Sequence, residues 1–529
     1  MSFPRLRPLG TAAWSVELGD ALDAAMNARV RALDHELARR PFDGFREAVP
    51  TLRSLLVLYD EAATSPAAVA RELGARLGAD PAPLPPGRLH EVPTVYGGDA
   101  GPDLAALARE RGRSEREIVG LHTARPYTAL MLGFKPGFAY LGLLPEELEC
   151  ARHKTPRVRV PAGSVALAGR QTGIYPVASP GGWQLIGRTS LRLFDPLRLQ
   201  PALFAPGDRV RFVSVAELPE PVLPAAPPDR SLAPVAVVRE PGLLTTVQDG
   251  GRPGHRRWGV CGAGPVDSPA HAAANRAVGN APGAAALECT VSGPALVFLT
   301  PVRFAVTGAD LGAVLERADL GSWPVPRGAS VLARPGNVLR FTGRRSGCRA
   351  YVALRGGIDV PAVLGSQATD LQAGFGGLAG RALQAGDRIA VDAGAREAAP
   401  REWRAELHAT TVTVRVVLGP QADHFDAEAT SRFLACAWRV GATSDRVGCR
   451  LEGEPLRHLG PSEILSDGMV PGSIQVPPDG LPIVMLPDGP TTGGYPKIAT
   501  VVTADLPLLG QLVPGEGHVR FEAVPLEEP

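Results

Sequence analysis

The chain has 529 residues, of which 45% are hydrophobic and 21% charged, and its formal net charge is +1. A chain of this length is too long for one hydrophobic core and should divide into about three or four domains. The balanced charge, with no basic run long enough to give the electrostatic footprint of nucleic-acid binding, argues against a nucleic-acid-binding protein. No apolar stretch approaches the length needed to span a membrane.

The cysteine pattern and the N-terminal segment both bear on location. Six cysteines are scattered without CxxC spacing, which argues against a zinc ribbon or a disulfide scaffold and favours a reducing compartment. The opening segment "MSFPRLRPLGTAAW" lacks the apolar core of a signal peptide. We therefore expect a cytoplasmic protein that binds neither nucleic acid nor membrane.

The first ninety residues are expected to form an α+β module. Apolar residues recur at helical spacing from Leu22 to Leu37, and "SLLVLYD" (54–60) predicts a short strand. Ser65 followed by Pro66 predicts the N-cap and first position of a second helix.

A change in composition follows. Ser114 and Glu117 form a capping box that opens one more short helix, and His122 falls at its C-terminal end. From about residue 127 to 214 the pattern is one of strands and turns. Six prolines in residues 217–234 then predict a semi-rigid linker.

A weak repeat indicates β modules of related design. The phrases "APGDRVRF" (205–212), "RPGNVLRF" (334–341), "QAGDRIAV" (384–391) and "VPGEGHVRF" (513–521) share a Gly turn, a polar residue and an alternating strand. Glycine supplies the positive φ of such a turn, and alternation gives a strand with one buried face. We therefore expect several barrel-like β modules.

The densest run of unusual residues is 153–196, which is rich in proline and glycine. Such backbone cannot be core strand throughout. Polar and aromatic side chains in this run are candidates to line a concave surface for a small polar ligand: Arg157, Ser164, Gln171, Tyr175 and Trp183. A set of hairpin turns with an aromatic plug is the alternative.

A second run, 466–506, is also rich in glycine and proline and carries polar side chains at its turns. Two glycines in "DGPTTGGYPK" let backbone approach a ligand, surrounded by Asp488, Thr491, Thr492, Tyr495 and Lys497. Only three of the 55 Lys plus Arg residues are lysine: Lys135, Lys154 and Lys497. Lys497 would offer a compact cation to an anionic group, or a base if desolvated, unless it only caps a turn beside Asp488.

The segment 262–280 predicts a loop and then a helix. Asp267 or Ser268 is well placed as its N-cap, with Pro269 at the first position. On these residues alone, capping is the favoured explanation of Asp267, and a functional role stays open. His255 and His271 have no second ligand at metal-binding spacing, so no metal is assigned. No phosphate-binding GxxxxGK[ST] loop and no Met-Lys-Met biotin acceptor occur.

Long motifs resemble known families. "HTARPYTALMLGFKPGFAYLG" and "TPRVRVPAGSVALAGRQTGIYPVASPGGWQLIGRT" closely resemble the allophanate hydrolase subunit 1 family, the KipI-like family that includes the B component of 5-oxoprolinase. "TVQDGGRPGHRRWGVCGAGPVDSPAHAAANRAVGN" and "SDGMVPGSIQVPPDGLPIVMLPDGPTTGGYPKIATVVTADL" resemble the subunit 2 family, the KipA-like family that includes the C component. The chain thus looks like a natural fusion of the two subunits, related to the carboxyltransferase domain of urea carboxylase.

The resemblance implies a fold that is mainly β, with an N-terminal α+β module and several cyclophilin-like β-barrel modules. The expected division is an α+β subdomain at 1–95, a barrel at 96–216, a Pro-rich linker at 217–234, a first barrel module of the subunit 2-like half at 235–400 and a second at 401–529.

The resemblance also implies a function and a partner. Members of these families are expected to act with a separately encoded third subunit of the LamB/YcsF type, opening 5-oxoproline to glutamate at the expense of ATP, with Mg and without covalent biotin. The implied catalytic residues are His122, Asp267 and Lys497. The implied substrate-binding residues are Arg157, Gln171, Tyr175, Trp183, Gln475, Asp488, Thr491, Thr492 and Tyr495.

Two other functions use the same scaffold and stay open at this point. One is a biotin-dependent carboxyltransferase acting on urea or another small amide. The other is a KipI-like regulator that inhibits a sensor histidine kinase. The sequence does not fix the oligomeric state, and a homo-oligomer is left open.

Overall fold

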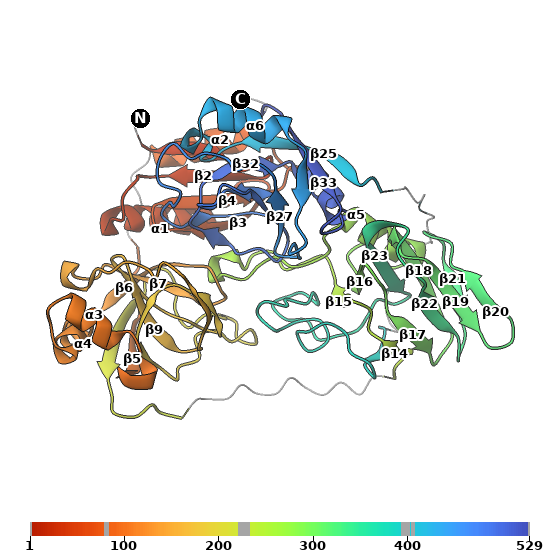
Figure 1. The fold of residues 1–529 in the computed structure, drawn as a ribbon, viewed down its shortest axis with the longest axis horizontal. Helices are drawn as coiled ribbons and strands as arrows, with labels where there is room; N and C mark the ends of the chain where they lie inside the picture. The colour runs from red at the N-terminus through yellow and green to blue at the C-terminus, as the bar shows by residue number, and fades with distance from the viewer. Residues whose placement is uncertain (1–2, 79–83, 221–232, 393–402, 404–407, 527–529) are drawn as a thin grey trace.

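The computed structural model describes residues 3–78, 84–220, 233–392, 403 and 408–526 (Figure 1). The fold is mainly β, with two closed barrels and several open sheets, which confirms the expected fold class. Most of the predicted linker, residues 221–232, lies outside the described residues.

The N-terminal module is a four-stranded sheet with two helices. Its strands run in the order β1-β2-β4-β3, and α1 packs on β3 and β4 while α2 packs on β2. Ser65 caps α2 and accepts a hydrogen bond from the Ala68 N–H, as predicted. The elements are β1 (Arg5–Pro8), β2 (Ala13–Glu17), α1 (Ala24–Arg39), β3 (Phe45–Pro50), β4 (Ser54–Tyr59) and α2 (Pro66–Leu77).

The first barrel closes in the order β10-β7-β6-β13-β5-β12-β9. Its elements are β5 (Leu89–Tyr96), α3 (Leu104–Glu110), α4 (Glu115–Thr123), β6 (Tyr127–Leu132), β7 (Ala139–Gly142), β9 (Ser164–Ala168), β10 (Gln171–Ile174), β12 (Gln184–Arg188) and β13 (Arg209–Ser214). A separate two-stranded sheet pairs β8 (Arg157–Val160) with β11 (Ser179–Gly181). The capping box of Ser114 and Glu117 opens α4 as predicted.

Residues 236–392, which were expected to lie in a first β-barrel module, form two open sheets. The orders are β20-β19-β22-β17-β14-β24 and β15-β16-β23-β18-β21, with α5 against β18 and β23. The elements are β14 (Ala236–Glu240), β15 (Leu244–Gln248), α5 (Ser268–Ala277), β16 (Ala286–Thr290), β17 (Ala295–Phe298), β18 (Val302–Asp310), β19 (Ala313–Arg317), β20 (Gly321–Pro324), β21 (Val331–Ala333), β22 (Val338–Phe341), β23 (Ser346–Leu354) and β24 (Arg388–Ile389). Alternation predicts a buried strand face, but closure depends on pairing between strands far apart in the chain.

The last module is the second closed barrel, in the order β25-β32-β29-β30-β27-β26-β33. Its elements are β25 (Thr411–Leu418), α6 (Ala427–Ala435), β26 (Trp438–Val440), β27 (Gly448–Glu452), β29 (Ser473–Gln475), β30 (Ile483–Met485), β32 (Lys497–Val501), α7 (Leu506–Gly510) and β33 (His518–Ala523). A short pair of β28 (Asp467–Gly468) and β31 (Thr492–Gly493) lies beside it.

The four repeat phrases all form the predicted turn and strand. Gly207, Gly336, Gly386 and Gly515 have φ values of 99°, 80°, 88° and 85°, and the strands β13, β22, β24 and β33 follow them. In both barrels the last strand pairs in parallel with the first, β13 with β5 and β33 with β25. This shared closure relates the two barrels.

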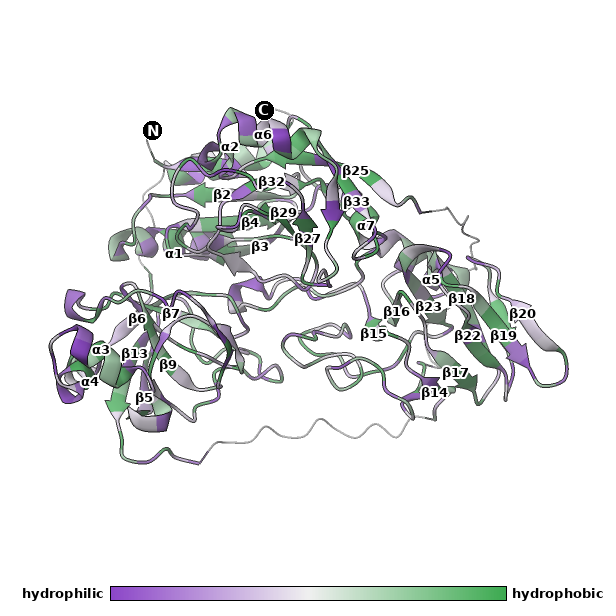
Figure 2. Ribbon diagram, in the orientation of Figure 1, coloured by the Kyte–Doolittle hydropathy of each residue, from purple (hydrophilic) through white to green (hydrophobic). Residues whose placement is uncertain are grey.

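Hydrophobic residues follow the strands of the sheets and barrels in Figure 2, and each module has its own buried core. None of the helices in the described ranges combines the length and the apolar character that crossing a bilayer requires.

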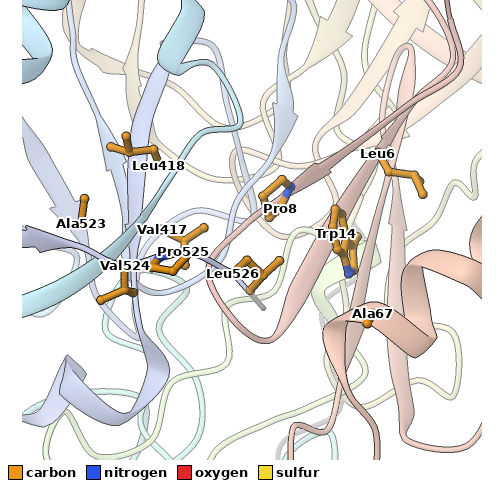
Figure 3. A pocket seen from close by; sticks show the side chains of 10 residues that line it. All are labelled: Leu6, Pro8, Trp14, Ala67, Val417, Leu418, Ala523, Val524, Pro525 and Leu526. Carbon is orange, nitrogen blue, oxygen red and sulfur yellow. The ribbon is translucent and has the colours of Figure 1, made fainter. Parts of the chain in front are cut away.

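The N-terminal sheet packs against the second barrel, which joins the two halves of the chain. A groove of about 600 Å³ lies between them and is apolar over most of its lining. As Figure 3 shows, Leu6, Pro8 and Trp14 face Val417, Leu418 and the segment 523–526 across it. Ion pairs also cross the halves: Arg257 with Asp34 at 2.6 Å, and Arg7 with Asp423 at 2.8 Å.

These contacts predict that the linker serves only as a tether. Cleaving the chain at a protease site inserted between residues 217 and 234 should leave a complex that elutes as one species in gel filtration, because apolar packing and ion pairs hold the halves together. Uncut protein is the control. Two separate fragments that do not recombine would show that the halves need covalent linkage.

Candidate functional site at the junction of the two barrels

A wall of aromatic side chains lines one face of the first barrel. The ring of Phe138 lies 5.4 Å from Tyr175 and 5.6 Å from Trp183, and Tyr140 lies 5.9 Å from Trp183. All four are buried, and such edge-on pairs add to the burial energy. A Cβ on Gly181 would lie 2.2 Å from the Tyr175 hydroxyl, so a glycine is needed there. The sequence-predicted residues Tyr175 and Trp183 therefore belong to one buried aromatic cluster.

The second barrel meets this wall through Thr492. Its Oγ1 accepts a hydrogen bond from the Phe134 N–H at 3.2 Å, and the Tyr140 hydroxyl interacts with the side chains of Ser466 and Thr492. A Cβ on Gly133 would lie 2.0 Å from Thr492 Oγ1. The close approach of the two barrels thus depends on a glycine at position 133.

Lys497 lies directly behind this contact. Its side chain has no exposed surface, and its Nζ is 3.2 Å from Asp467 Oδ2. Asp467 also accepts hydrogen bonds from the Ser54 hydroxyl and from Gln421 Nε2. Burial alone would raise the pKa of Asp467, but Lys497, Ser54 and Arg53 together hold it below its usual value. The site therefore contains a buried, paired ammonium group.

Further predicted residues surround the same loop. Gln475 Nε2 lies 3.5 Å from the Tyr495 carbonyl oxygen. The Thr491 hydroxyl is buried and finds no hydrogen-bond partner among the described residues. An unpartnered buried hydroxyl is costly unless another group satisfies it, so Thr491 is the part of this loop best placed to take a ligand atom.

A polar cleft of about 320 Å³ opens on the far side of Gln421. Its lining includes Glu17, Arg53, Asp423 and His424. Gln421 Oε1 accepts a hydrogen bond from the backbone N–H of Lys497 at 3.2 Å, which connects the cleft to the buried lysine. The apolar groove of Figure 3 contains no such groups, so of these two cavities only the polar cleft offers charged side chains to a ligand.

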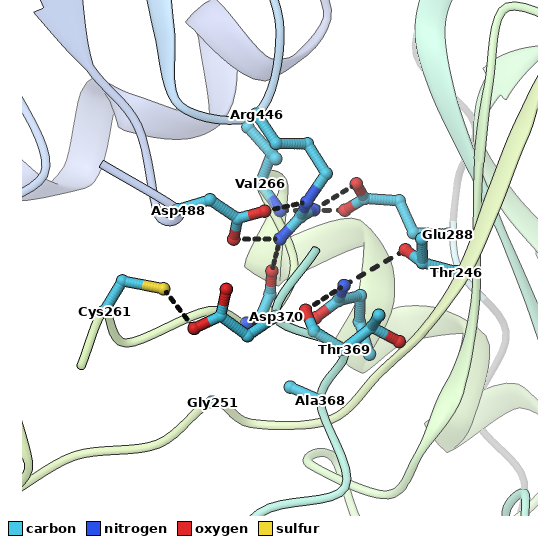
Figure 4. A network of polar contacts seen from close by, with 12 residues as sticks. Thr246, Gly251, Cys261, Val266, Glu288, Ala368, Thr369, Asp370, Arg446 and Asp488 are labelled. Atoms are coloured by element: carbon cyan, nitrogen blue, oxygen red, sulfur yellow. Dashed lines mark hydrogen bonds and ion pairs between the residues drawn. The ribbon is translucent and has the colours of Figure 1, made fainter. Parts of the chain in front are cut away.

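Arg446 organises a second polar network, drawn in Figure 4, where the second barrel meets the 236–392 module. Its Nε and Nη2 donate to the two oxygens of Asp488, each at 2.8 Å, and its Nη1 pairs with Glu288. Burial raises the pKa of Asp488 to about 6, although Arg446 opposes the shift. Because both carboxylate oxygens are occupied, Asp488 is held in place within the protein.

Asp267 lies at the edge of that interface. It caps α5, as predicted, by accepting from the Ala270 N–H at 3.0 Å, and it accepts from Gln511 Nε2 at 2.7 Å. Burial raises its pKa. These contacts fix the helix against the second barrel.

Two predicted binding residues lie on the first barrel beside the aromatic wall. Arg157 Nη2 donates to Asp103 Oδ1 at 2.7 Å. Arg157 Nη1 and Gln171 Nε2 are both buried without a hydrogen-bond partner among the described residues. Both are donors that a ligand could satisfy.

His122 lies apart from all of these, inside the first barrel. It has no exposed surface, and its ring nitrogens contact Tyr96 Oη at 2.7 Å and Thr172 Oγ1 at 3.0 Å. Burial lowers its pKa to about 3. These contacts describe a neutral core histidine, and His122 has no part in the function proposed below.

The buried His122 makes stability depend on pH. The pKa of His122 is 6.5 in the unfolded chain and about 3 in the folded chain, so between these pH values only the unfolded chain binds a proton at this site. The free energy of unfolding is therefore unaffected above pH 6.5 and decreases as the pH falls below it. At pH 5 the loss should be about 2 kcal/mol, since one pKa unit is about 1.4 kcal/mol. Urea unfolding at pH 7 and pH 5 should show this extra loss in the wild type but not in His122→Gln. Equal losses in both proteins would contradict it.

Sequence patterns single out Lys497 but not its partner Asp467, nor Tyr140 and Phe134 in the other barrel. Asp467 lies in the same Gly-rich run as Lys497, which is the one signal that pointed to it. Besides Lys497 and Gln421, Asp467 contacts Ser54, which is 413 residues away in the sequence. No local pattern encodes that contact.

Comparisons with known proteins agree with a two-part chain. The family model described as carboxyltransferase domain, subdomain C and D, matches residues 4–204, and the one described as carboxyltransferase domain, subdomain A and B, matches residues 258–523. The chain is 40% identical over 288 residues to the C component of the 5-oxoprolinase of Escherichia coli K12, covering 54% of this chain and 90% of that protein.

Two further similarities cover the rest of the chain. It is 44% identical over 213 residues to the B component of the 5-oxoprolinase of Escherichia coli O157:H7, covering 40% of this chain and 95% of that protein. The crystal structure of the protein TTHA0988 aligns with a TM-score of 0.85 at 36% identity, covering 97% of this chain and all of the other.

Proposed function

The chain belongs to the carboxyltransferase-domain family, with subdomains C and D preceding A and B, and on that basis we propose that it is a fused component of an ATP-dependent 5-oxoprolinase. The reaction opens 5-oxo-L-proline to L-glutamate. One observation carries the proposal: a single polypeptide matches nearly the full length of two different 5-oxoprolinase components, the B component in its first half and the C component in its second.

The proposal includes a partner and a location. Because these relatives are themselves named as separate parts of one enzyme, they support a further, separately encoded subunit, for which the LamB/YcsF type is our assignment, and an assembly in the cytoplasm. ATP would arrive as its Mg complex. Among the described residues, no group of three His, Cys, Asp or Glu side chains is placed to hold a metal. We assign no covalent biotin.

The chemistry explains why cations and hydroxyl donors are needed. A lactam is a poor electrophile, and transfer of the γ-phosphoryl group of ATP to its oxygen, with release of ADP, creates a leaving group. One water then adds to the activated ring carbon, and the C–N bond breaks as the nitrogen takes a proton, which leaves an acyl phosphate. A second water releases phosphate from it and gives the γ-carboxylate of glutamate. Negative charge develops on the reacting oxygens, and preorganised donors stabilise it. We assign this role to Lys497 and the Thr491 and Thr492 hydroxyls, with the aromatic wall excluding water.

The test is turnover with and without the partner. The purified chain alone should have little activity, whereas the chain with its third subunit should form glutamate, ADP and phosphate in equal amounts from 5-oxoproline and ATP. Robust activity of the isolated chain would overturn the need for a partner. No activity in any pairing would overturn the 5-oxoprolinase assignment and favour the kinase-regulator alternative, and carboxyl transfer to urea would favour the carboxyltransferase.

A further inference from the structure

A strongly basic arm, residues 152–159, borders the aromatic wall. Its sequence, "RHKTPRVR", contains four Arg or Lys residues, one His and no acidic residue, in a chain whose net charge, with His neutral, is only +1. The side chains of Arg152, Lys154 and Arg159 are exposed. None of these three has an ion-pair partner among the described residues. Such a local excess of positive charge attracts anions.

The arm is held in a fixed position. Within it, Arg157 and His153 both contact Asp103, at 2.7 and 3.2 Å, and the His153 N–H donates to the Gly182 carbonyl at 2.7 Å. The Ala151 carbonyl accepts from Gln184 Nε2 at 3.0 Å. Asp103 and these backbone contacts thus anchor the arm, and Arg152, Lys154 and Arg159 are left for another partner.

The arm also faces the candidate site. Arg157 pairs with Gly181 between β8 and β11, and a Cβ on Gly181 would lie 2.2 Å from the Tyr175 hydroxyl, which places the arm beside the aromatic wall. Arg157 and Arg159 are two residues apart on β8 and so share one face of that strand. The unpartnered Arg157 Nη1 adds a buried donor on the same strand.

We propose that the basic arm binds the phosphate chain of the nucleoside triphosphate that the reaction consumes. Guanidinium groups bind phosphate oxygens in pairs and an ammonium group binds them as a point charge, and three unpaired cations within eight residues suit a chain of linked phosphates. The identity of the ligand rests on the proposed function, whereas the position of the binding site is assigned from charge and geometry alone. A protein surface is the less favoured occupant, because the cations gather on one short arm.

The test is binding to the full-length chain without turnover. Inorganic tripolyphosphate and the β,γ-imido analogue of ATP, each with Mg²⁺, would be titrated by calorimetry into the wild type and the triple variant Arg152→Ala, Lys154→Ala, Arg159→Ala. We expect the variant to bind both probes at least about tenfold more weakly, because each exposed charge contact is modest and three are removed. Added salt should weaken binding to the wild type more than to the variant.

The matched control removes three exposed arginines from helices of the same half, as Arg39→Ala, Arg71→Ala and Arg109→Ala, and should keep the wild-type affinity. Equal affinity of the two triple variants, or no binding by the wild type, would overturn the inference. So would an arm variant that binds both probes normally but no longer co-elutes with the third subunit. If the arm binds phosphate but the complex has no 5-oxoprolinase activity, the arm is still a phosphate-binding site and the proposed function is overturned instead.

Discussion

Replacing Arg446 by alanine is expected to lower the free energy of unfolding by about 3–5 kcal/mol, the cost of leaving buried charges unpaired. Arg446, Glu288 and Asp488 are all almost fully buried, and the arginine joins the two carboxylates across the interface of two modules. Its Nη2 also donates to the Gly264 carbonyl at 2.7 Å. Removing it leaves two carboxylates and a backbone oxygen without this partner.

Urea unfolding of Arg446→Ala measures the effect, and Arg439→Ala is the control. Arg439 pairs with Glu452, but these side chains are 52% and 43% exposed, so its loss should cost less than about 1 kcal/mol. The double variant Glu288→Gln, Asp488→Asn on the Arg446→Ala background should recover part of the stability, because it removes the uncompensated charges. Similar unfolding curves for Arg446→Ala and Arg439→Ala would contradict the argument.

Local features of the fold could be predicted because their causes lie within a few residues. The Ser65 and Asp267 caps and the Ser114 capping box each need one side chain and the backbone three positions on. Closure of a barrel needs strands such as β25 and β33 to pair across about a hundred residues of chain. Strand patterns are therefore readable from sequence, whereas the difference between the open 236–392 module and the second barrel is not.

The candidate site shows the same division. The resemblance singled out Lys497, Thr492 and Trp183, which the structure brings to one junction, yet the contacts that hold Thr492 and the partner of Lys497 come from the other half of the chain. Thr492 meets the Phe134 N–H, and the carboxylate that pairs with Lys497 is itself held by Ser54. His122 belongs to the same family pattern, but its surroundings are those of a core residue. A motif does not distinguish a residue kept for packing from one kept for chemistry.

Replacing Lys497 by methionine or by arginine should reduce turnover of the complex with its partner subunit by about a hundred- to a thousand-fold, the usual cost of losing one preorganised electrostatic contact. The site fits a compact ammonium group: Lys497 is fully buried and lies 3.2 Å from Asp467. The planar guanidinium of arginine is larger and needs several partners, so Lys497→Arg should be nearly as damaging as Lys497→Met.

Stability has to be separated from chemistry in this experiment, because Lys497→Met leaves Asp467 buried without its cation. The double variant Lys497→Met, Asp467→Asn removes that charge and should restore the melting temperature without restoring activity. Lys135→Arg is the control, since Lys135 donates to Gln372 Oε1, lies apart from Asp467 and Lys497, and can be replaced by an arginine that makes the same bond. Glutamate formation and ADP release are measured for each protein beside its melting temperature. If Lys497→Arg keeps most of its activity, the cation at this position does not stabilise the reacting oxygen, and the donors of Arg157 and Gln171 become the better candidates.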